Sequence, residues 1–298
     1  MIVFLNGKFV AEEKATVSVL DRGFLYGDGV FEGVLFKRGQ PFRWMEHMER
    51  MAEGIDSLKL TLPYKPKQLE QFALELVKRN RMPDCILRLT LSRGITARGY
   101  SPRNAVRPAV VMTVHRLPFL DGKKIPRWRV ITASFRLPVN DPLTRFKTGN
   151  KLTQVLARAE ADAADAQEAI LLNTAGHLAE GTTSNIFWVK NNEVFTTPLP
   201  SGALPGVTRG AIFDLCVDLN VKFRERKARP AALHQADGAF LTMTSMGVVE
   251  IASLDRRPLR RSPLVTKIWA GYRELLNRIP RNRLQSTPAW VTSYSRKH

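Results

Sequence analysis

The sequence has little cysteine, few acidic residues and no long apolar run. Its two cysteines, Cys85 and Cys216, follow no disulfide or ligand spacing in 298 residues. This argues against a disulfide scaffold and favours reduced thiols and a cytoplasmic location. No run of 18 or more apolar residues occurs, so we expect no membrane span. The opening MIVFLNGKFV has only a short apolar run without a basic leader, so we predict no secretory signal.

The shortage of acidic residues makes the chain strongly basic. Lys and Arg number 46 against 27 Asp and Glu, which gives a net charge of +19. Such a surface attracts anionic small molecules or nucleic acids. The basic residues are spread along the chain without an RNA-reading or zinc-finger motif, so we expect neither a nucleic-acid partner nor a metal site. A non-catalytic nucleic-acid-binding protein is the alternative from another functional class.

The length and the 44% hydrophobic composition are sufficient for two packed domains. The stretch LPFLDGKKIPRW, at residues 117–128, contains two prolines, a glycine and three basic residues, as linkers do. We therefore predict a small N-terminal α/β domain over residues 1–117, a linker over 118–128 and a larger C-terminal domain over 129–298. The polar, basic tail after about residue 280 is predicted to be poorly ordered.

Apolar periodicity and turn residues predict a mixed α and β chain. Helices are predicted over residues 44–58, 67–79, 152–166, 207–218 and 266–277. Strands are predicted in a hairpin over 4–9, and over 29–36, 86–91, 109–114, 168–172, 185–189 and 239–242. This pattern alone assigns no function.

Lys147 lies in FKTGNKL, a turn-like segment directly before a predicted helix. A lysine that reacts with a carbonyl must lose its proton near neutral pH, and burial or nearby cations lower its pKa. Arg145 and Lys151 are close in sequence and provide such cations. Taken by itself, a lysine in so basic a chain would more simply be an exposed loop lysine, so Lys147 needs support from other segments.

Three later segments give Lys147 a chemical context. EGTTSNIF starts with the carboxylate of Glu180 and continues through small hydroxyl residues into a strand. ALPGVTRG, at 203–210, places a glycine turn before a helix, whose free N–H groups and positive dipole end suit a phosphate. TMTSMG, at 242–247, is a hydroxyl-rich turn after a strand. Each segment alone is also an ordinary turn, whereas their joint order is specific.

Together these segments resemble the class IV aminotransferases, the fold-type IV family of pyridoxal 5'-phosphate enzymes. The resemblance runs from Phe4 to about Ile251 and includes LDRGFLYGDGVFEG, at 20–33, and HMER, at 47–50. It implies a two-domain α/β fold with pyridoxal 5'-phosphate bound in the cleft between the domains. It also implies a homodimer, with the partner subunit closing one side of the cleft.

The resemblance assigns roles to the residues that match the family pattern. Lys147 corresponds to the lysine that forms the Schiff base and shuttles the substrate proton. Glu180 corresponds to the carboxylate that keeps the pyridine nitrogen protonated, so that the ring can accept electrons. The phosphate-binding residues implied by the pattern are Arg50, Val207, Thr208 and Thr244.

The substrate pocket is less clearly assigned. The resemblance implies Tyr26, Phe31 and Arg88 as pocket residues, with Ser245 and Arg98 as further candidates. Arg103 and Arg107 could also bind a substrate carboxylate, or all three loop arginines could simply be solvated. Gly33 favours the branched-chain type, whereas SRGITARGYS, at 92–101, resembles the lyase type. At position 151 this chain has lysine, where branched-chain enzymes have tyrosine and the lyase has arginine.

We therefore predict a transaminase that moves an amino group between an amino acid, most similar to the branched-chain class, and a 2-oxo acid. The alternative is an aminodeoxychorismate lyase, which uses the same cofactor to give 4-aminobenzoate and pyruvate.

Overall fold

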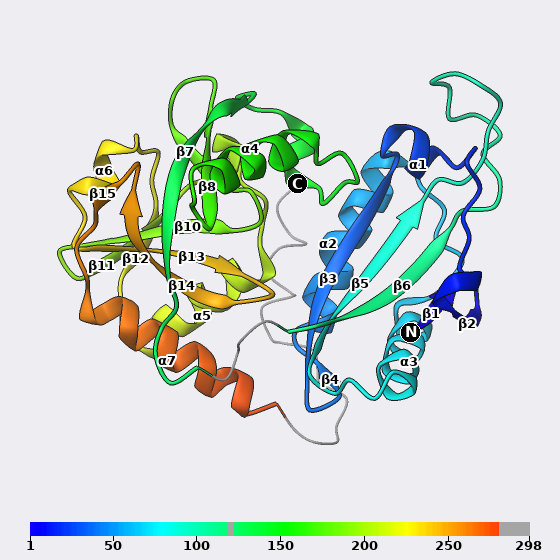
Figure 1. Ribbon diagram of the computed structural model, residues 1–298, viewed down its shortest axis with the longest axis horizontal. Coiled ribbons are helices and arrows are strands. Elements are labelled where there is room, and N and C mark those ends of the chain that lie inside the picture. Colours follow the sequence, from blue (N-terminus) through cyan, green and yellow to red (C-terminus); the bar gives the residue numbers. More distant parts are fainter. Residues whose placement is uncertain (118–121, 280–298) are drawn as a thin grey trace, which may run out of the picture.

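A computed structural model describes residues 1–117 and 122–279, which form two β-sheets with helices around them (Figure 1). The first half of the chain forms a six-stranded antiparallel sheet in the order β2-β1-β6-β5-β3-β4. Its strands are β1 (Ile2–Leu5), β2 (Lys8–Ala11), β3 (Gly29–Lys37), β4 (Gln40–Pro41), β5 (Cys85–Ser92) and β6 (Val110–Arg116).

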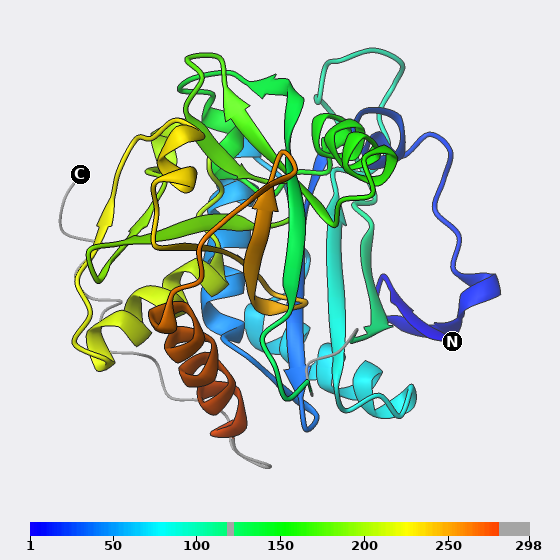
Figure 2. The same ribbon diagram turned by 60° about the vertical axis from the view of Figure 1, so that its left-hand side comes forward.

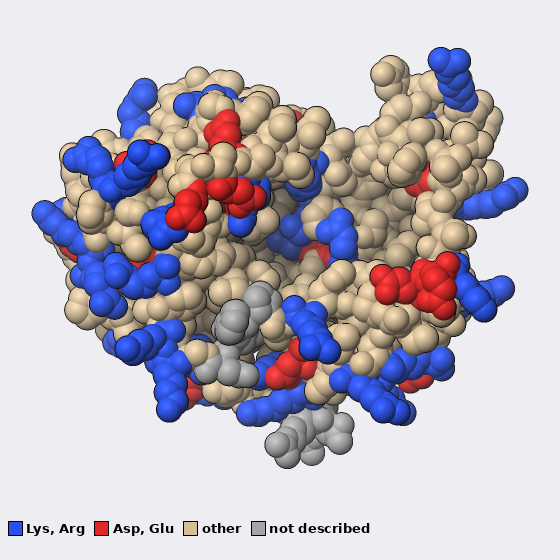
Figure 3. Space-filling view, viewed as in Figure 1, with Lys and Arg blue, Asp and Glu red and all other residues tan. Residues whose placement is uncertain are grey.

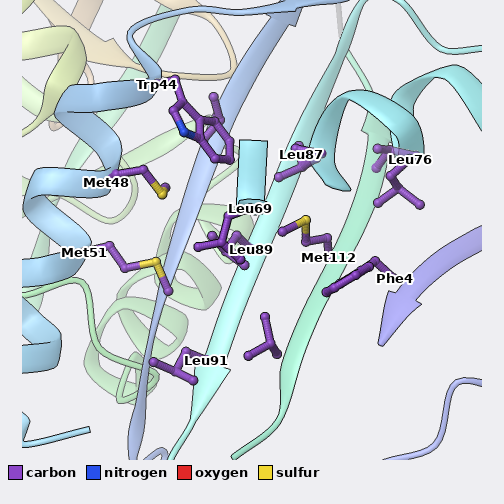
Figure 4. Close-up of a cluster of buried hydrophobic side chains, with 14 of the residues drawn as sticks. Phe4, Trp44, Met48, Met51, Leu69, Leu76, Leu87, Leu89, Leu91 and Met112 are labelled. Atoms are coloured by element: carbon purple, nitrogen blue, oxygen red, sulfur yellow. The ribbon is translucent and has the colours of Figure 1, made fainter. Parts of the chain in front are cut away.

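Helices α2 (Trp44–Leu58) and α3 (Pro66–Arg79) cover this sheet, while the short α1 (Arg22–Tyr26) precedes β3. Figure 4 shows the resulting core, where Met48 and Met51 of α2 face Leu89 and Leu91 of β5. Leu89 is fully buried at the centre of the sheet. The apolar face of α3 is the face that it buries, whereas in α2 Met48 and Met51 are buried but Met45, at the start of the helix, is 40% exposed.

The second half forms a nine-stranded mixed sheet in the order β12-β11-β10-β13-β14-β7-β8-β9, with β15 paired to β14. Its strands are β7 (Arg127–Leu137), β8 (Glu168–Asn173), β9 (Leu178–Gly181), β10 (Asn185–Lys190), β11 (Glu193–Thr196), β12 (Phe223–Glu225), β13 (Gly238–Met243), β14 (Gly247–Leu254) and β15 (Arg257–Pro258). Its helices are α4 (Leu152–Ala163), α5 (Val207–Asp218), α6 (Ala231–His234) and α7 (Pro263–Asn277). Figure 2 shows α5 and α7 side by side.

One apolar cluster joins the two halves. Leu35 and Phe42 of the first half are buried in the same cluster as Leu215 of α5 and Tyr272 of α7. The rings of Phe42 and Tyr272 meet edge to face at 5.9 Å between centroids. This contact fixes the first sheet against the helices of the second half.

The two cysteines are free and buried. Burial raises the pKa of the Cys85 thiol to about 12 and that of Cys216 to about 11. Both side chains therefore behave as small apolar core residues rather than as nucleophiles.

The mixed α and β architecture and its fold class are confirmed, and the predicted helices at 44–58 and 207–218 end where the structure places them. Two long strands, β7 and β14, were missed. β7 begins at Arg127, inside the predicted linker, whose residues 118–121 lie outside the described range. The predicted tail after 280 lies outside it too, and the division into independent domains stays a prediction. No helix of the described residues could cross a membrane.

Leu89→Ala tests the core of the first sheet. Removing this buried side chain should lower the free energy of unfolding by about 2–5 kcal/mol, because it loses apolar burial and leaves a cavity. Chemical denaturation measures the change. The control Val217→Ala, at a 67% exposed position of α5, should change stability by less than about 0.5 kcal/mol. Equal effects of the two substitutions would contradict the proposed core.

Candidate functional site

A cavity of about 800 Å³ lies between the two halves of the chain. The hollow is visible at the centre of the space-filling view, with basic and acidic side chains inside it (Figure 3). Among the lining residues are Phe31, Arg50 and Arg88 from the first half and Lys147, Lys151, Glu180, Val207, Thr208, Thr244 and Ser245 from the second. The structure thus gathers most of the predicted site residues around one cavity.

Lys147 is positioned by backbone pairing with the start of β3. The N–H of Phe31 donates to the Lys147 carbonyl at 2.9 Å, and the N–H of Gly149 donates to the Gly29 carbonyl at 2.9 Å. Gly149 must lack a side chain, since a Cβ there would lie 2.9 Å from the Gly27 carbonyl oxygen. The lysine side chain runs beside Phe31, with Nζ 4.5 Å from the ring centroid.

The environment of Lys147 favours the neutral amine. Burial and the nearby charge of Arg50 lower its pKa from 10.5 to about 8. Lys151 contributes in the same direction, whereas Glu32 and Glu180 oppose it. The lowered pKa greatly increases the fraction of this amine that is unprotonated near neutral pH and able to attack a carbonyl, compared with an ordinary lysine.

Glu180, in β9, faces the same cavity. The backbone N–H of Leu204 donates to its Oε2 at 2.8 Å. Burial raises the pKa of Glu180, while the Leu204 bond and the charges of Lys151 and Lys147 act against this rise. Because burial disfavours the ionised form of Glu180, a cationic N–H donor placed opposite the carboxyl group would stabilise that form strongly.

The start of α5 forms an anion cradle. Its first-turn N–H groups, at Val207 and Thr208, have no partner within the helix and carry the positive end of the dipole. Asn185 Nδ2 donates to the Leu204 carbonyl at 2.9 Å and fixes the loop before the helix. A side chain at Gly206 would collide with Asn185 Oδ1, so the backbone approaches closely only with glycine there.

Arg50 joins this cradle from α2. Its Nε and Nη2 donate to the two oxygens of Glu32 at 2.8 and 2.6 Å, and Nη1 donates to the Pro205 carbonyl at 3.0 Å. Three of the five guanidinium N–H groups are thereby used, which leaves two for an anion. Burial alone would raise the pKa of Glu32, but Arg50 and His47 lower it to about 2, so this carboxylate stays ionised.

The turn after β13 contributes hydroxyl groups. Thr244 and Ser245 line the cavity, and so does Thr242. Thr242 Oγ1 is buried without a hydrogen-bond partner among the described residues. An unpartnered buried hydroxyl is costly unless a ligand completes it, so it indicates a polar ligand at this wall.

Phe31 and Arg88 form the opposite wall. The Arg88 guanidinium carbon lies 3.8 Å from the Phe31 ring centroid. In the described part of the chain, no carboxylate is within ion-pair distance of Arg88. The same two residues border a second cavity of about 250 Å³.

The structure does not bring Tyr26 and Arg98 to either cavity. Tyr26 lies beside Tyr100, with 5.4 Å between ring centroids, and Arg22 lies over its ring. Arg98 is exposed in the loop before β6. Their roles in substrate binding stay predictions.

Two buried carboxylates near the cavity, Glu32 and Glu168, were not assigned roles from the sequence, and Lys151 was considered there only as a cation near Lys147. The Lys151 side chain lines the cavity and forms no hydrogen bond or ion pair with the described residues, and burial lowers its pKa. Glu32 and Glu168 are fully buried. The sequence signal for both glutamates was a single acidic residue among the apolar residues of a strand, as in VFEGV and QEAIL. A charged side chain is buried in such a place only when hydrogen bonds or an ion pair compensate its charge.

Comparison with known proteins relates the site to a family. The sequence pattern described as amino-transferase class IV matches residues 29–254. A protein of Methanocaldococcus jannaschii, provisionally named a branched-chain-amino-acid aminotransferase, is 36% identical over 86% of this chain and 89% of its own length. An aminodeoxychorismate lyase of Bacillus subtilis is 28% identical over 85% of this chain and 87% of its own.

One solved structure has a backbone fold very similar to that of this chain. The T.th. branched-chain amino acid aminotransferase with pyridoxamine 5'-phosphate has a TM-score of 0.86 and 30% identity, covering 92% of this chain and 93% of its own. Among the described residues, no group of three or more His, Cys, Asp and Glu could hold a metal ion.

The pH dependence of Lys147 labelling tests its environment. We expect acetic anhydride to modify Lys147 with a rate that is half-maximal near pH 8 rather than 10.5, because only the neutral amine reacts. Peptide mass spectrometry at a series of pH values measures the rate. In Lys151→Met the half-point should move to higher pH, because a neighbouring positive charge is removed. A half-point near 10.5 in the unmodified protein would refute the inferred environment.

Proposed function

Because this chain belongs to the class IV aminotransferase family, we propose that it binds pyridoxal 5'-phosphate and moves an amino group between an amino acid and a 2-oxo acid. The observation that carries this proposal is that the Lys147 amine, the Glu180 carboxyl and the anion cradle at Val207 line one cavity. In this proposal Lys147 is the catalytic lysine.

The cavity residues fit this cofactor. A dianionic phosphate needs several donors, which Arg50, Thr208, Thr244 and the first turn of α5 supply. The unpartnered hydroxyl of Thr242 indicates that a polar ligand completes this wall. The lowered pKa of Lys147 suits an amine that must bind an aldehyde.

The bound cofactor supplies an electron-accepting ring that stabilises negative charge at the substrate Cα. Lys147 Nζ would be the base that removes the Cα proton of the substrate and returns it. The Glu180 carboxylate accepts a hydrogen bond at the ring-nitrogen end of the site, and the Leu204 N–H orients it. The clamp of Arg50 by Glu32 keeps the guanidinium directed at the phosphate end.

The substrate side favours an apolar amino acid of the branched-chain class. Phe31 and Ile86 offer apolar surface, and Gly33 leaves space beside them. Arg88 is available for a substrate carboxylate. Support for this class comes from the relatives named branched-chain aminotransferases, while the lyase of Bacillus subtilis supports the alternative of aminodeoxychorismate cleavage.

We also propose a homodimer in the cytoplasm. The cytoplasmic location is supported by the two free cysteines. The dimer is supported by large apolar side chains left exposed in α1, the segment before it and α4, since such surface normally marks an interface. These residues are Val19, Leu20, Phe24, Leu25, Leu152 and Val155, with 47–73% exposure.

An amino-donor panel tests the reaction. With 2-oxoglutarate or pyruvate as acceptor and both enantiomers of alanine, glutamate and the branched-chain amino acids as donors, we expect turnover of branched-chain donors. Lys147→Ala should abolish turnover, and the exposed control Lys222→Ala should retain it. Release of pyruvate from aminodeoxychorismate without any 2-oxo acid acceptor would favour the lyase instead.

Phe24→Glu tests the dimer. Phe24 is 73% exposed in the single chain, and burying an introduced charge at an interface is unfavourable, so the variant should elute as a monomer. Light scattering coupled to size exclusion measures the mass. Val217→Glu, 67% exposed in α5, should remain dimeric. A monomeric unmodified protein would refute the assembly.

A further inference from the structure

Glu168 is a fully buried carboxylate directly behind the loop that follows Glu180. It is the first residue of β8, and its side chain is 0% exposed. None of the lysines and arginines in the described ranges forms an ion pair with it. The energy lost when this charge leaves water must therefore be recovered through hydrogen bonds alone.

Six donors surround the Glu168 carboxylate. Oε1 accepts from the N–H of Ala169 at 2.9 Å, from the N–H of Thr182 at 3.1 Å and from the Thr182 hydroxyl. Oε2 accepts from the N–H of Thr183 at 3.3 Å, from its hydroxyl at 3.2 Å and from the Ser184 hydroxyl at 3.1 Å. Glu168 is the acceptor in all six of these hydrogen bonds, and three of the donors are backbone N–H groups, which can only donate.

These bonds fix the polarity of the cavity wall. Thr182, Thr183 and Ser184 all line the cavity, and each hydroxyl has a single proton, which it gives to Glu168. Toward the cavity these hydroxyls can therefore only accept hydrogen bonds. Gly181 allows the tight turn, because a side chain there would collide with Ser184 Oγ.

We propose that Glu168 is a positioning residue for the ring-nitrogen end of the cofactor site, where it makes the wall beside Glu180 an acceptor surface that favours a protonated ring nitrogen. This inference rests on the proposed function. A ligand group at this wall must donate, and a pyridinium N–H does so whereas a neutral pyridine nitrogen does not.

The charge of Glu168 acts in the same direction as its hydrogen bonds. It is one of the causes that raise the pKa of Glu180, behind the larger contribution of burial. A second negative charge near Glu180 makes a cation in front of it more favourable. Hydrogen-bond polarity and charge thus both select the protonated ring.

Binding of two cofactors to the apoprotein tests this role. We would measure the dissociation constants of pyridoxal 5'-phosphate and of its 1-deaza analogue, in which CH replaces the ring nitrogen, by fluorescence quenching. In the unmodified protein the constants should favour the nitrogen-containing cofactor. In Glu168→Gln the ratio should fall about tenfold, equivalent to about one pKa unit at the ring nitrogen, because the amide donates where the carboxylate accepted.

Two further variants separate this role from a loss of stability. Glu250, in β14, is another buried glutamate; it pairs with Arg127 at 2.7 Å and does not line the cavity. Glu250→Gln should therefore leave the ratio unchanged. Thr183→Val removes one acceptor from the wall and one of the six hydrogen bonds to Glu168, but leaves the Glu168 side chain itself in place, and should lower the ratio partly. This variant keeps the proposal testable if Glu168→Gln does not fold.

The outcomes distinguish the two proposals. If the unmodified protein binds neither cofactor, the proposed function is wrong. If it forms the Lys147 adduct and prefers the nitrogen-containing cofactor, but Glu168→Gln and Thr183→Val keep the full ratio, only the role of Glu168 is wrong. A purely structural role would weaken both affinities equally and leave the ratio unchanged, which would also overturn the inference.

Discussion

The site depends on the backbone pairing between residues 147–149 and the start of β3. Two hydrogen bonds at Phe31 and Gly149 extend the first sheet with a segment that leads into α4 of the second half. The pairing register decides which side chains face the cavity, because a shift by one residue would turn Lys147 away from it. The Lys147 amine is therefore held by the sheet of the half that supplies Arg50 and Phe31.

Three carboxylates around the cavity differ in their donors, and this difference separates their roles. Glu32 is bound by the Arg50 guanidinium, which it orients. Glu168 is bound by N–H and hydroxyl donors and shapes the loop at 182–184. Glu180 is bound by one backbone N–H and keeps an oxygen for the ligand. Only the last faces the cavity with unused acceptor capacity, which is what a ring-nitrogen partner requires.

The sequence was sufficient to predict the elements whose pattern is local. Helix α2 has clear apolar periodicity, and α5 begins directly after Pro205-Gly206. Lys147 and Glu180 lie in distinctive short segments. β7 was missed although its sequence, RWRVITASFRL, alternates polar and apolar residues from 127 to 130 and again from 131 to 137. Its first residues lie inside the segment predicted as a linker because of its prolines and glycine. A role for Glu168 was not predicted because its hydrogen-bond donors lie in a loop 14 or more residues away in the sequence. Only folding brings this loop next to Glu168.

The burial of Cys85 and Cys216 has a practical consequence for studying this protein in motion. Thiols with such suppressed acidity react slowly with maleimides and with spin-label reagents, because the thiolate is the reactive form. A cysteine introduced on each side of the cleft would then be the preferred attachment site for a fluorophore or nitroxide. Distances between the two halves could be followed during turnover without first replacing the native residues.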